Sequence, residues 1–404
     1  MKILWVTPKW TLPAIDGARV ATEKLLVNTN VENVSIDYLC FANKNELIDE
    51  DLMKEKWKIN NIFVKRRTLP ESRIKKAIYY ILKICKNPFI PITFSSFSTK
   101  VNKSFLSQTL SKSDYDFVLF DGLHLASTLD LRNYKKILKK TKIIYRAHNI
   151  ESDLWLKSYE DEKNIFKKMI FKVQYNLVFK FEKEIIDISD GVAAISQEDK
   201  NVIEKLSSSN KTFLAPLGMS FGNELPQVIN NKTNLLFVGR LDWAPNKDGL
   251  KWILDEVWPK VYSDRKDIEL HVVGSGNRSW LDKYLGTEGV IFHGFVESIE
   301  QSYKDSSFSI APIRFGSGTR IKVIETFAYG RMLISTTMGV QGSTLTPSDY
   351  VCADSSDEWI EVLSSIKQTD EIESKLENTR SKMEKIFGEK MIGESFYRWL
   401  ETFL

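Results

Sequence analysis

Residues 312–330 read Pro-Ile-Arg-Phe-Gly-Ser-Gly-Thr-Arg-Ile-Lys-Val-Ile-Glu-Thr-Phe-Ala-Tyr-Gly and follow an apolar run at 308–311. The spacing predicts a strand, a glycine-rich turn and a helix. On a helical wheel the apolar residues share one side: Ile321, Val323, Ile324, Phe327 and Ala328. The polar residues share the other side: Thr319, Lys322, Glu325 and Thr326. The helix is therefore expected to have one face for the core and one for a ligand.

A glycine-rich turn that leads into a helix predicts a site for an anion. Free backbone N–H groups and the helix dipole both favour negative charge at that end. Lys322 would add a full positive charge, and Glu325 could accept hydrogen bonds from sugar hydroxyls. The pattern favours a phosphorylated, hydroxyl-rich ligand, although the same spacing also suits an ordinary helical ion pair.

Length and composition limit the class of protein. A chain of 404 residues favours two domains. A net charge of +4 gives no general case for nucleic acid as a partner. Three cysteines lack metal-ligand spacing, and the first residues do not resemble a signal peptide. With no apolar run long enough to span a membrane, we expect a cytoplasmic protein.

The first half opens as a doubly wound α/β domain. An apolar strand at 2–7 precedes a loop with Gly17 and a helix at 19–28. The loop lacks the Gly-x-Gly-x-x-Gly fingerprint, so no dinucleotide cofactor is indicated. The other expected strands are 34–41, 62–64, 117–120, 142–147 and 191–195, and one continuous helix is expected over 159–188.

Polar side chains follow two of these strands. Asp121 and His124 come after 117–120, and His148 follows 142–147. Ligands bind at the carboxyl ends of strands in open α/β sheets, so these residues are the candidates nearest the chemistry. The alternative is that each is a buried polar residue that holds a loop.

Residues 73–89 interleave lysine and arginine with isoleucine and tyrosine. A basic helix of this kind suits contact with an anionic membrane surface. The alternative is a helix that packs on the core and exposes its lysines.

The second half repeats the architecture without repeating the sequence. Strands are expected at 234–238, 269–273, 290–292, 308–311 and 332–336, with helices over 358–387. We therefore predict an α/β fold in which two Rossmann-like doubly wound domains face a central cleft. The expected division is an N-terminal domain at 1–215, a linker at 216–233, a C-terminal domain at 234–387, and a helix at 388–404 that packs back towards the N-terminal domain.

Three segments carry a family resemblance: 235–240 with Pro245-Asn-Lys247, 272–276, and 312–342. In order and spacing they resemble the retaining, nucleotide-sugar-dependent glycosyltransferases of the GT-B fold, glycosyl transferases group 1. The first half is similar at Asp16-Gly17 and at Arg146-Ala-His-Asn-Ile-Glu151.

The resemblance implies a role for each matching residue of the nucleotide site. Glu325 would hold the ribose, while Arg240 and Lys322, with Lys247 as a partner, would neutralise the diphosphate. Phe295 and Val296 would lie along the base. The diphosphate would rest on the loop and its backbone amides, and the N-terminal loop would approach it: Gly316, Ser317, Gly318, Thr319, Arg320 and Gly17. Ser317 stands where many relatives carry a glutamate, which leaves the donor sugar open.

The implied activity is transfer of a sugar from a UDP- or GDP-sugar to a glycan or lipid-linked acceptor, with retention, in cell-surface polysaccharide synthesis. His124, Asp121 and His148 are the catalytic candidates. Neither a metal nor a cofactor is expected, because Arg240, Lys247 and Lys322 could supply the positive charge. The expected location is cytoplasmic, with peripheral attachment to the inner face of the membrane. The competing functions are a non-catalytic sugar- or partner-binding subunit and a sugar-nucleotide epimerase.

Overall fold

The computed structural model describes residues 1–14, 17–29, 31–67, 72, 79–80, 82–83, 87–130, 134, 138, 140–207, 211–222, 232–277, 279–316 and 320–404. The chain divides into two compact units. The first comprises Met1–Gly218 with Ile392–Leu404, and the second comprises Met219–Met391.

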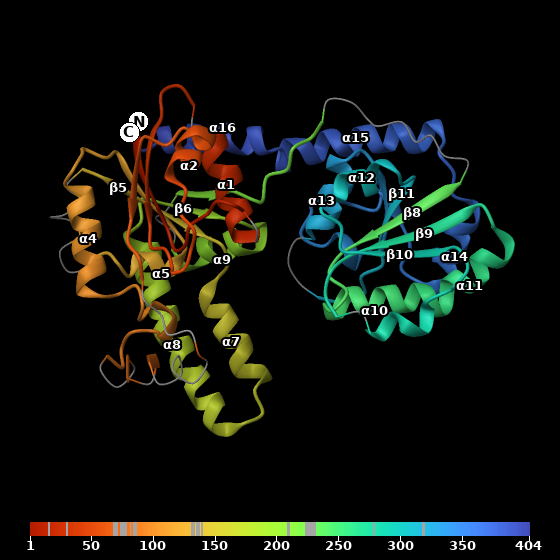
Figure 1. Ribbon diagram of the computed structural model, residues 1–404, viewed down its shortest axis with the longest axis horizontal. Helices are drawn as coiled ribbons and strands as arrows, with labels where there is room; N and C mark the ends of the chain where they lie inside the picture. The colour runs from red at the N-terminus through yellow and green to blue at the C-terminus, as the bar shows by residue number, and fades with distance from the viewer. Residues whose placement is uncertain are drawn as a thin grey trace. The chain divides into compact units, whose positions relative to one another are not determined.

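The first unit is built on a parallel sheet of seven strands in the order β3-β2-β1-β4-β5-β6-β7 (Figure 1). Its strands are β1 (Lys2–Thr7), β2 (Ser35–Cys40), β3 (Asn61–Val64), β4 (Phe117–Asp121), β5 (Lys142–Ala147), β6 (Gly191–Ala194) and β7 (Lys211–Leu214). Its helices are α1 (Gly17–Thr29), α2 (Glu50–Trp57), the 3-10 turn η1 (Ile92–Phe94), α4 (Lys100–Leu110), α5 (Leu123–Ala126), α7 (Glu151–Asp161), α8 (Ile165–Ile188), α9 (Gln197–Leu206) and most of α16 (Glu389–Glu401).

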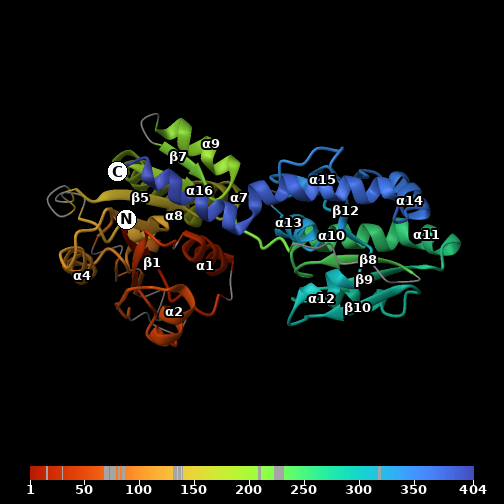
Figure 2. The same cartoon turned by 90° about the horizontal axis from the view of Figure 1, so that it is seen from above.

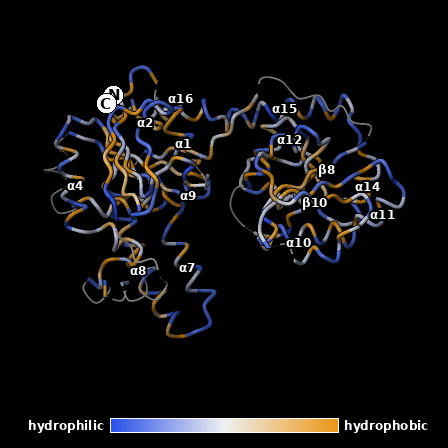
Figure 3. The backbone as a smooth tube through the Cα atoms, viewed as in Figure 1, coloured by the Kyte–Doolittle hydropathy of each residue, from blue (hydrophilic) through white to orange (hydrophobic). Residues whose placement is uncertain are grey.

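Alternate side chains of β1 fill two separate cores, one on each face of this sheet. Ile3 and Trp5 pack with α1, α2 and α16, whereas Leu4 and Val6 pack with α4, α8 and α9. In Figure 3 the buried strands of this sheet are mostly orange, the colour of hydrophobic residues.

The end of the chain belongs to the first unit. On α16, the ring of Phe396 lies 6.4 Å from Trp5 and 5.5 Å from Phe213. Lys211 Nζ donates to the carbonyl of Thr402 at 2.9 Å. Figure 2 shows α16 beside β7.

The second unit has a parallel sheet of six strands in the order β10-β9-β8-β11-β12-β13. Its strands are β8 (Thr233–Val238), β9 (Ile268–Val273), β10 (Val290–Gly294), β11 (Phe308–Ala311), β12 (Met332–Ser335) and β13 (Val351–Cys352). Its helices are α10 (Ala244–Trp252), the π-helical turn η2 (Ile253–Val257), α11 (Trp258–Asp264), the 3-10 turn η3 (Ser279–Tyr284), α12 (Ile299–Lys304), α13 (Ile321–Ala328), the 3-10 turn η4 (Met338–Val340), α14 (Ser356–Ser365) and α15 (Asp370–Phe387). In each sheet the strand order reverses beside the first strand, which confirms the predicted pair of Rossmann-like α/β domains.

Three local predictions need correction or lie outside the description. The helix expected over 159–188 is broken, because Asn164 begins α8 by accepting from the backbone N–H groups of Phe166 and Lys167 at 3.1 Å. Most of the basic segment 73–89, and residues 223–231 of the expected linker, lie outside the described residues.

The wheel was wrong at two positions of α13. Ile321 is 43% exposed because it is the first residue of the helix, ahead of the turn that meets the sheet. Thr326 is buried, and it satisfies its hydroxyl by donating to the carbonyl of Lys322 at 2.7 Å.

No helix among the described residues is long and apolar enough to cross a membrane.

Candidate functional site

The second unit brings three segments together where its strand order reverses. Lys322 on α13 donates to Asn246 Oδ1 on α10 at 2.8 Å. Asn246 Nδ2 in turn donates to the carbonyl of Arg240, just after β8, at 2.9 Å. Gly239 leaves room for this chain, because a Cβ there would lie 2.5 Å from Asn246 Nδ2. The end of one strand and two helices are thereby joined at the edge of the sheet where ligands bind.

Lys322 and Glu325 are both held away from water. Burial lowers the pKa of Lys322 to about 7, against the attraction of Glu325. Burial also raises the pKa of Glu325 to about 7, although Lys322 favours the carboxylate. The Lys322 ammonium lies 4.1 Å from the centre of the Phe237 ring. An anion beside this ammonium would restore its charge, because an opposite charge stabilises the protonated form.

Arg240 extends into solvent and is held by a neighbour that sequence reasoning missed. Its Nε and Nη2 donate to Asp242 at 3.1 and 2.8 Å. A bidentate pair fixes the plane of the guanidinium. In the sequence, only the position of Asp242 two residues after Arg240 could have suggested this pairing. Acidic and basic residues at this spacing are too common for the pair to be predicted.

Lys247 lies on α10, directly after Asn246. Its ammonium lies 5.8 Å from the centre of the Trp280 ring, and the residue before it, Asn246, makes the contacts with Lys322 and Arg240. One residue on a helix turns a side chain by about 100°. Asn246 was missed because its role depends on that rotation.

The remaining nucleotide-site candidates are placed as follows. Gly316 has a φ of +117°, which favours glycine, and Arg320 is buried with its guanidinium 5.5 Å from the Trp243 ring. Phe295 is 74% exposed, and Val296 packs beside the small core of Leu236, Val273 and Tyr303. Ser317, Gly318 and Thr319 lie outside the described residues.

In the first unit, Asp121 is the centre of a buried polar network at the end of β4. Its carboxylate accepts from Trp5 Nε1 at 3.1 Å and from Thr22 Oγ1 at 2.7 Å. Arg146 Nη1 and His148 Nε2 lie 3.1 and 2.6 Å from Asp121 Oδ1. Burial alone would raise the pKa of Asp121, but Arg146 and His148 hold it well below its usual range. Such a carboxylate is a poor base.

His124 stands on the short helix α5, directly after Asp121 and Gly122. Its ring centre lies 4.8 Å from that of Phe97. Burial, with Arg67 nearby, lowers the pKa of His124 to about 4, so the imidazole is neutral at pH 7. A neutral ring can donate or accept one hydrogen bond to a sugar hydroxyl.

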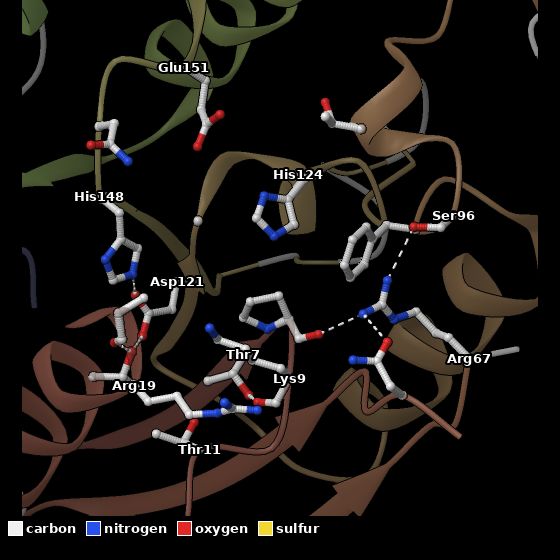
Figure 4. A pocket seen from close by; sticks show the side chains of 18 of the residues that line it. Thr7, Lys9, Thr11, Arg19, Arg67, Ser96, Asp121, His124, His148 and Glu151 are labelled. Atoms are coloured by element: carbon white, nitrogen blue, oxygen red, sulfur yellow. Dashed lines mark hydrogen bonds and ion pairs between the residues drawn. The ribbon is translucent and has the colours of Figure 1, made fainter. Parts of the chain in front are cut away.

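Asp121, His124 and His148 line one pocket of about 470 Å³, as Figure 4 shows. Gly17 begins α1, and a Cβ there would meet nothing within 4 Å. Glu151, at the start of α7, also lines the pocket, and burial beside Glu182 raises its pKa to about 7.

Arg67 forms another wall of this pocket (Figure 4). Its guanidinium lies 3.9 Å from the centre of the Phe97 ring and donates to Ser96 Oγ at 3.2 Å and to the carbonyl of Pro8 at 2.9 Å. Each bonded acceptor is a neutral oxygen, so an anionic ligand group would be stabilised beside it. Sequence reasoning missed Arg67, since nothing local distinguishes it from Arg66.

Among the described residues, no group of three or more His, Cys, Asp or Glu side chains is placed to hold a metal ion.

Comparison with known proteins gives a family match within the second unit. Residues 232–366 match the family described as Glycosyl transferases group 1. A protein of Klebsiella pneumoniae, named as an uncharacterized 44.6 kDa protein in the cps region, is 25% identical over 305 residues, which cover 68% of this chain and 74% of that protein.

Two solved structures are similar to this chain over its full length and over their own full length. HepE of Anabaena, in complex with UDP and glucose, is 12% identical with a TM-score of 0.58. The apo lipopolysaccharide outer core galactosyltransferase WaaB is 16% identical with a TM-score of 0.59. At these identities the likeness shows the fold. Residues 232–366 are therefore similar to a glycosyl transferases group 1 domain, in a chain that has the GT-B fold.

Proposed function

We propose that this protein transfers a hexose from a UDP- or GDP-sugar to a glycan or lipid-linked acceptor, with retention of configuration, in the synthesis of a cell-surface polysaccharide. The observation that carries the proposal is the linked set of Arg240, Asn246 and Lys322 at the switch point of the second sheet, one helical turn from Glu325. A relative from a cps region and the UDP complex of HepE support the same class of donor and product.

The charges fit the leaving group. Lys322 and Arg240 would stabilise the diphosphate as the glycosidic C–O bond breaks and negative charge develops on oxygen. Glu325 would accept hydrogen bonds from the ribose. With two cations at this position, we propose transfer that needs no metal ion.

The pocket of the first unit suits the sugar end of the reaction. Asp121 is held by Arg146 and His148 and keeps its charge, so we assign it to positioning His148. Neutral His124 would hydrogen-bond the transferred sugar. The acceptor oxygen would form the new bond to the anomeric carbon and pass its proton to the departing phosphate, which balances the transfer without a protein base.

The test is release of nucleoside diphosphate from a panel of UDP- and GDP-sugars, with and without EDTA. We expect release with one donor class, unchanged by EDTA and lowered about 100-fold by Lys322→Met. Lys304→Met, which removes an exposed lysine from α12, is the matched control.

Release from no donor in the panel would contradict the transferase proposal, and donor binding without turnover would favour a binding subunit. The anomeric configuration of the product, read by NMR, tests retention. An inverted product would move the role of base to Glu151.

A further inference from the structure

The helical hairpin of α7 and α8 carries apolar side chains that the described residues of its unit leave exposed. Five side chains near the start of α8 are between 51% and 75% exposed: Ile165, Phe166, Met169, Ile170 and Val173. At 3.6 residues per turn they fall within an arc of about 140°. We call this set the α8 apolar face.

The α8 apolar face points away from α7. On the side of α8 that meets α7, Phe171 lies 5.9 Å from Trp155, and the ammonium groups of Lys168 and Lys172 lie 5.1 and 4.9 Å from the centre of the Tyr159 ring. Figure 1 shows the hairpin extending away from the sheet of the first unit. A clustered apolar surface of this kind indicates a site of interaction.

The charge around the face identifies the partner. Residues 165–181 include four lysines and neither Asp nor Glu. Lys167 and Lys172 flank the apolar arc, and their long stems can extend along an apolar surface while the ammonium stays in water. Within residues 165–181 the charged side chains are all lysines, although Glu160, Asp161 and Glu162 precede this segment. An apolar stripe bordered by lysines along its helix fits the boundary of a bilayer with anionic headgroups.

A further exposed aromatic residue belongs to a segment that packs on α8. Phe89 is 86% exposed. Three residues later, Ile92 N–H donates to Gln174 on α8 at 2.8 Å, and the Phe94 ring lies 5.1 Å from Phe181. Phe89 is therefore three residues away from a segment that is bound to α8 through Ile92 and Phe94.

The surface is continuous with elements that line the pocket. Glu151, the first residue of α7, lines the pocket, and so do Thr93 and Ser96 from the turn that packs on α8. The hairpin and the segment that packs on it therefore also contribute residues to the pocket.

We propose that the α8 apolar face and its lysines bind an anionic lipid bilayer and so present the pocket to an acceptor whose lipid remains in that bilayer. The bilayer contact stands by itself, while the acceptor rests on the proposed function.

Flotation of the full chain with vesicles of phosphatidylcholine, with or without phosphatidylglycerol, tests the surface. Phe166→Ser with Ile170→Ser should lower the partition coefficient at least about tenfold. Lys167→Gln with Lys172→Gln should lower it about tenfold on anionic vesicles only. Leu285→Ser, which removes an exposed leucine from the second unit, should leave the partition coefficient unchanged on both kinds of vesicle.

Unchanged binding of the Phe166→Ser, Ile170→Ser variant to anionic vesicles would overturn the proposal. A wild-type dimer that this variant converts to monomer, without lipid binding by either, would overturn it as well and assign the face to a second copy. UDP binding, measured by calorimetry on the same samples, separates the two proposals. Loss of vesicle binding with UDP binding intact supports the surface, whereas absence of UDP binding in the wild type counts against the donor site alone.

Discussion

At the scale of single residues, the two halves of the chain use buried charge differently. Asp121 and Arg146 are a fully buried ion pair with further hydrogen bonds on the carboxylate. Burial instead shifts the pKa values of Lys322 and Glu325 towards their neutral forms, and a ligand could restore the charge of the lysine. The first arrangement stabilises a fold, and the second suits a site.

Asp121→Asn should destabilise the first unit by about 3–5 kcal/mol, because Arg146 would keep its charge in the core without a counter-charge. Urea denaturation followed by circular dichroism measures the change. Asp187→Asn removes a carboxylate from an exposed pair with Lys183 and should alter stability by less than about 0.5 kcal/mol. Equal stability of the Asp121 variant and the wild type would refute the structural role.

Glu151 predicts a pH dependence of stability. Its pKa is raised in the folded chain, so between pH 4.5 and about 7 the folded state keeps a proton that the unfolded state releases. Wild-type stability should therefore fall as pH rises through this window, and Glu151→Gln should remove up to about 3 kcal/mol of that fall. Chemical denaturation at pH 4.5 and at pH 8 measures this fall in stability for the wild type and for Glu151→Gln. Glu160→Gln, at an exposed position, is the control. If the stability of the wild type and of Glu151→Gln changed equally with pH, the proposed contribution of Glu151 would be ruled out.

At the scale of elements, the closing helix completes a core that begins at the first strand. Gly393 of α16 meets α1 so closely that a Cβ would lie 2.3 Å from the carbonyl oxygen of Asn28. Phe396 and Leu400 follow one and two turns later and are fully buried. The absence of a side chain at Gly393 sets how near the two helices lie.

Gly393→Ala should therefore destabilise the first unit by about 1–3 kcal/mol, even though alanine favours a helix by about 1 kcal/mol over glycine. Chemical denaturation of the full chain measures the difference. Glu394→Ala, at the adjacent exposed position of α16, is the control and should be neutral. A stabilised Gly393 variant would show that helix propensity outweighs the contact.

Element prediction from the sequence succeeded where one apolar run or one periodicity decides the structure. The residues expected at 308–311 are those of β11, and the helix expected to follow the glycine-rich turn is α13, which begins at Ile321. It failed where a polar residue interrupts a periodic stretch. Asn164 ends one helical pattern and caps the next, and the lysines and phenylalanines on either side hid that break.

At the scale of the whole molecule, the chain has two units with separate hydrophobic cores. Each sheet places polar residues at its own switch point. The nucleotide-site candidates from Arg240 to Glu325 belong to the second unit, so ligand binding there should stabilise that unit first.

Scanning calorimetry should show two transitions, and UDP at 100 times its Kd should raise the stability of the second unit by about 2.7 kcal/mol. Lys322→Met should abolish the shift because it removes the ammonium that would meet the diphosphate. Lys304→Met should retain it. A shift confined to the transition of the first unit would place the nucleotide elsewhere.

The sequence alone determined the fold class, the positions of most strands along the chain and the placement of Lys322 and Glu325 on the same helix, because these depend on local spacing and on apolar runs. Tertiary structure decided what each polar side chain meets. Asp121 draws its partners from β1, α1 and β5, and Asn246 joins Lys322 to the carbonyl of Arg240. Arg67 reaches the pocket from beyond β3. Burial and charge pairing depend on residues distant in the chain, and they follow only once the sheets have brought those residues together.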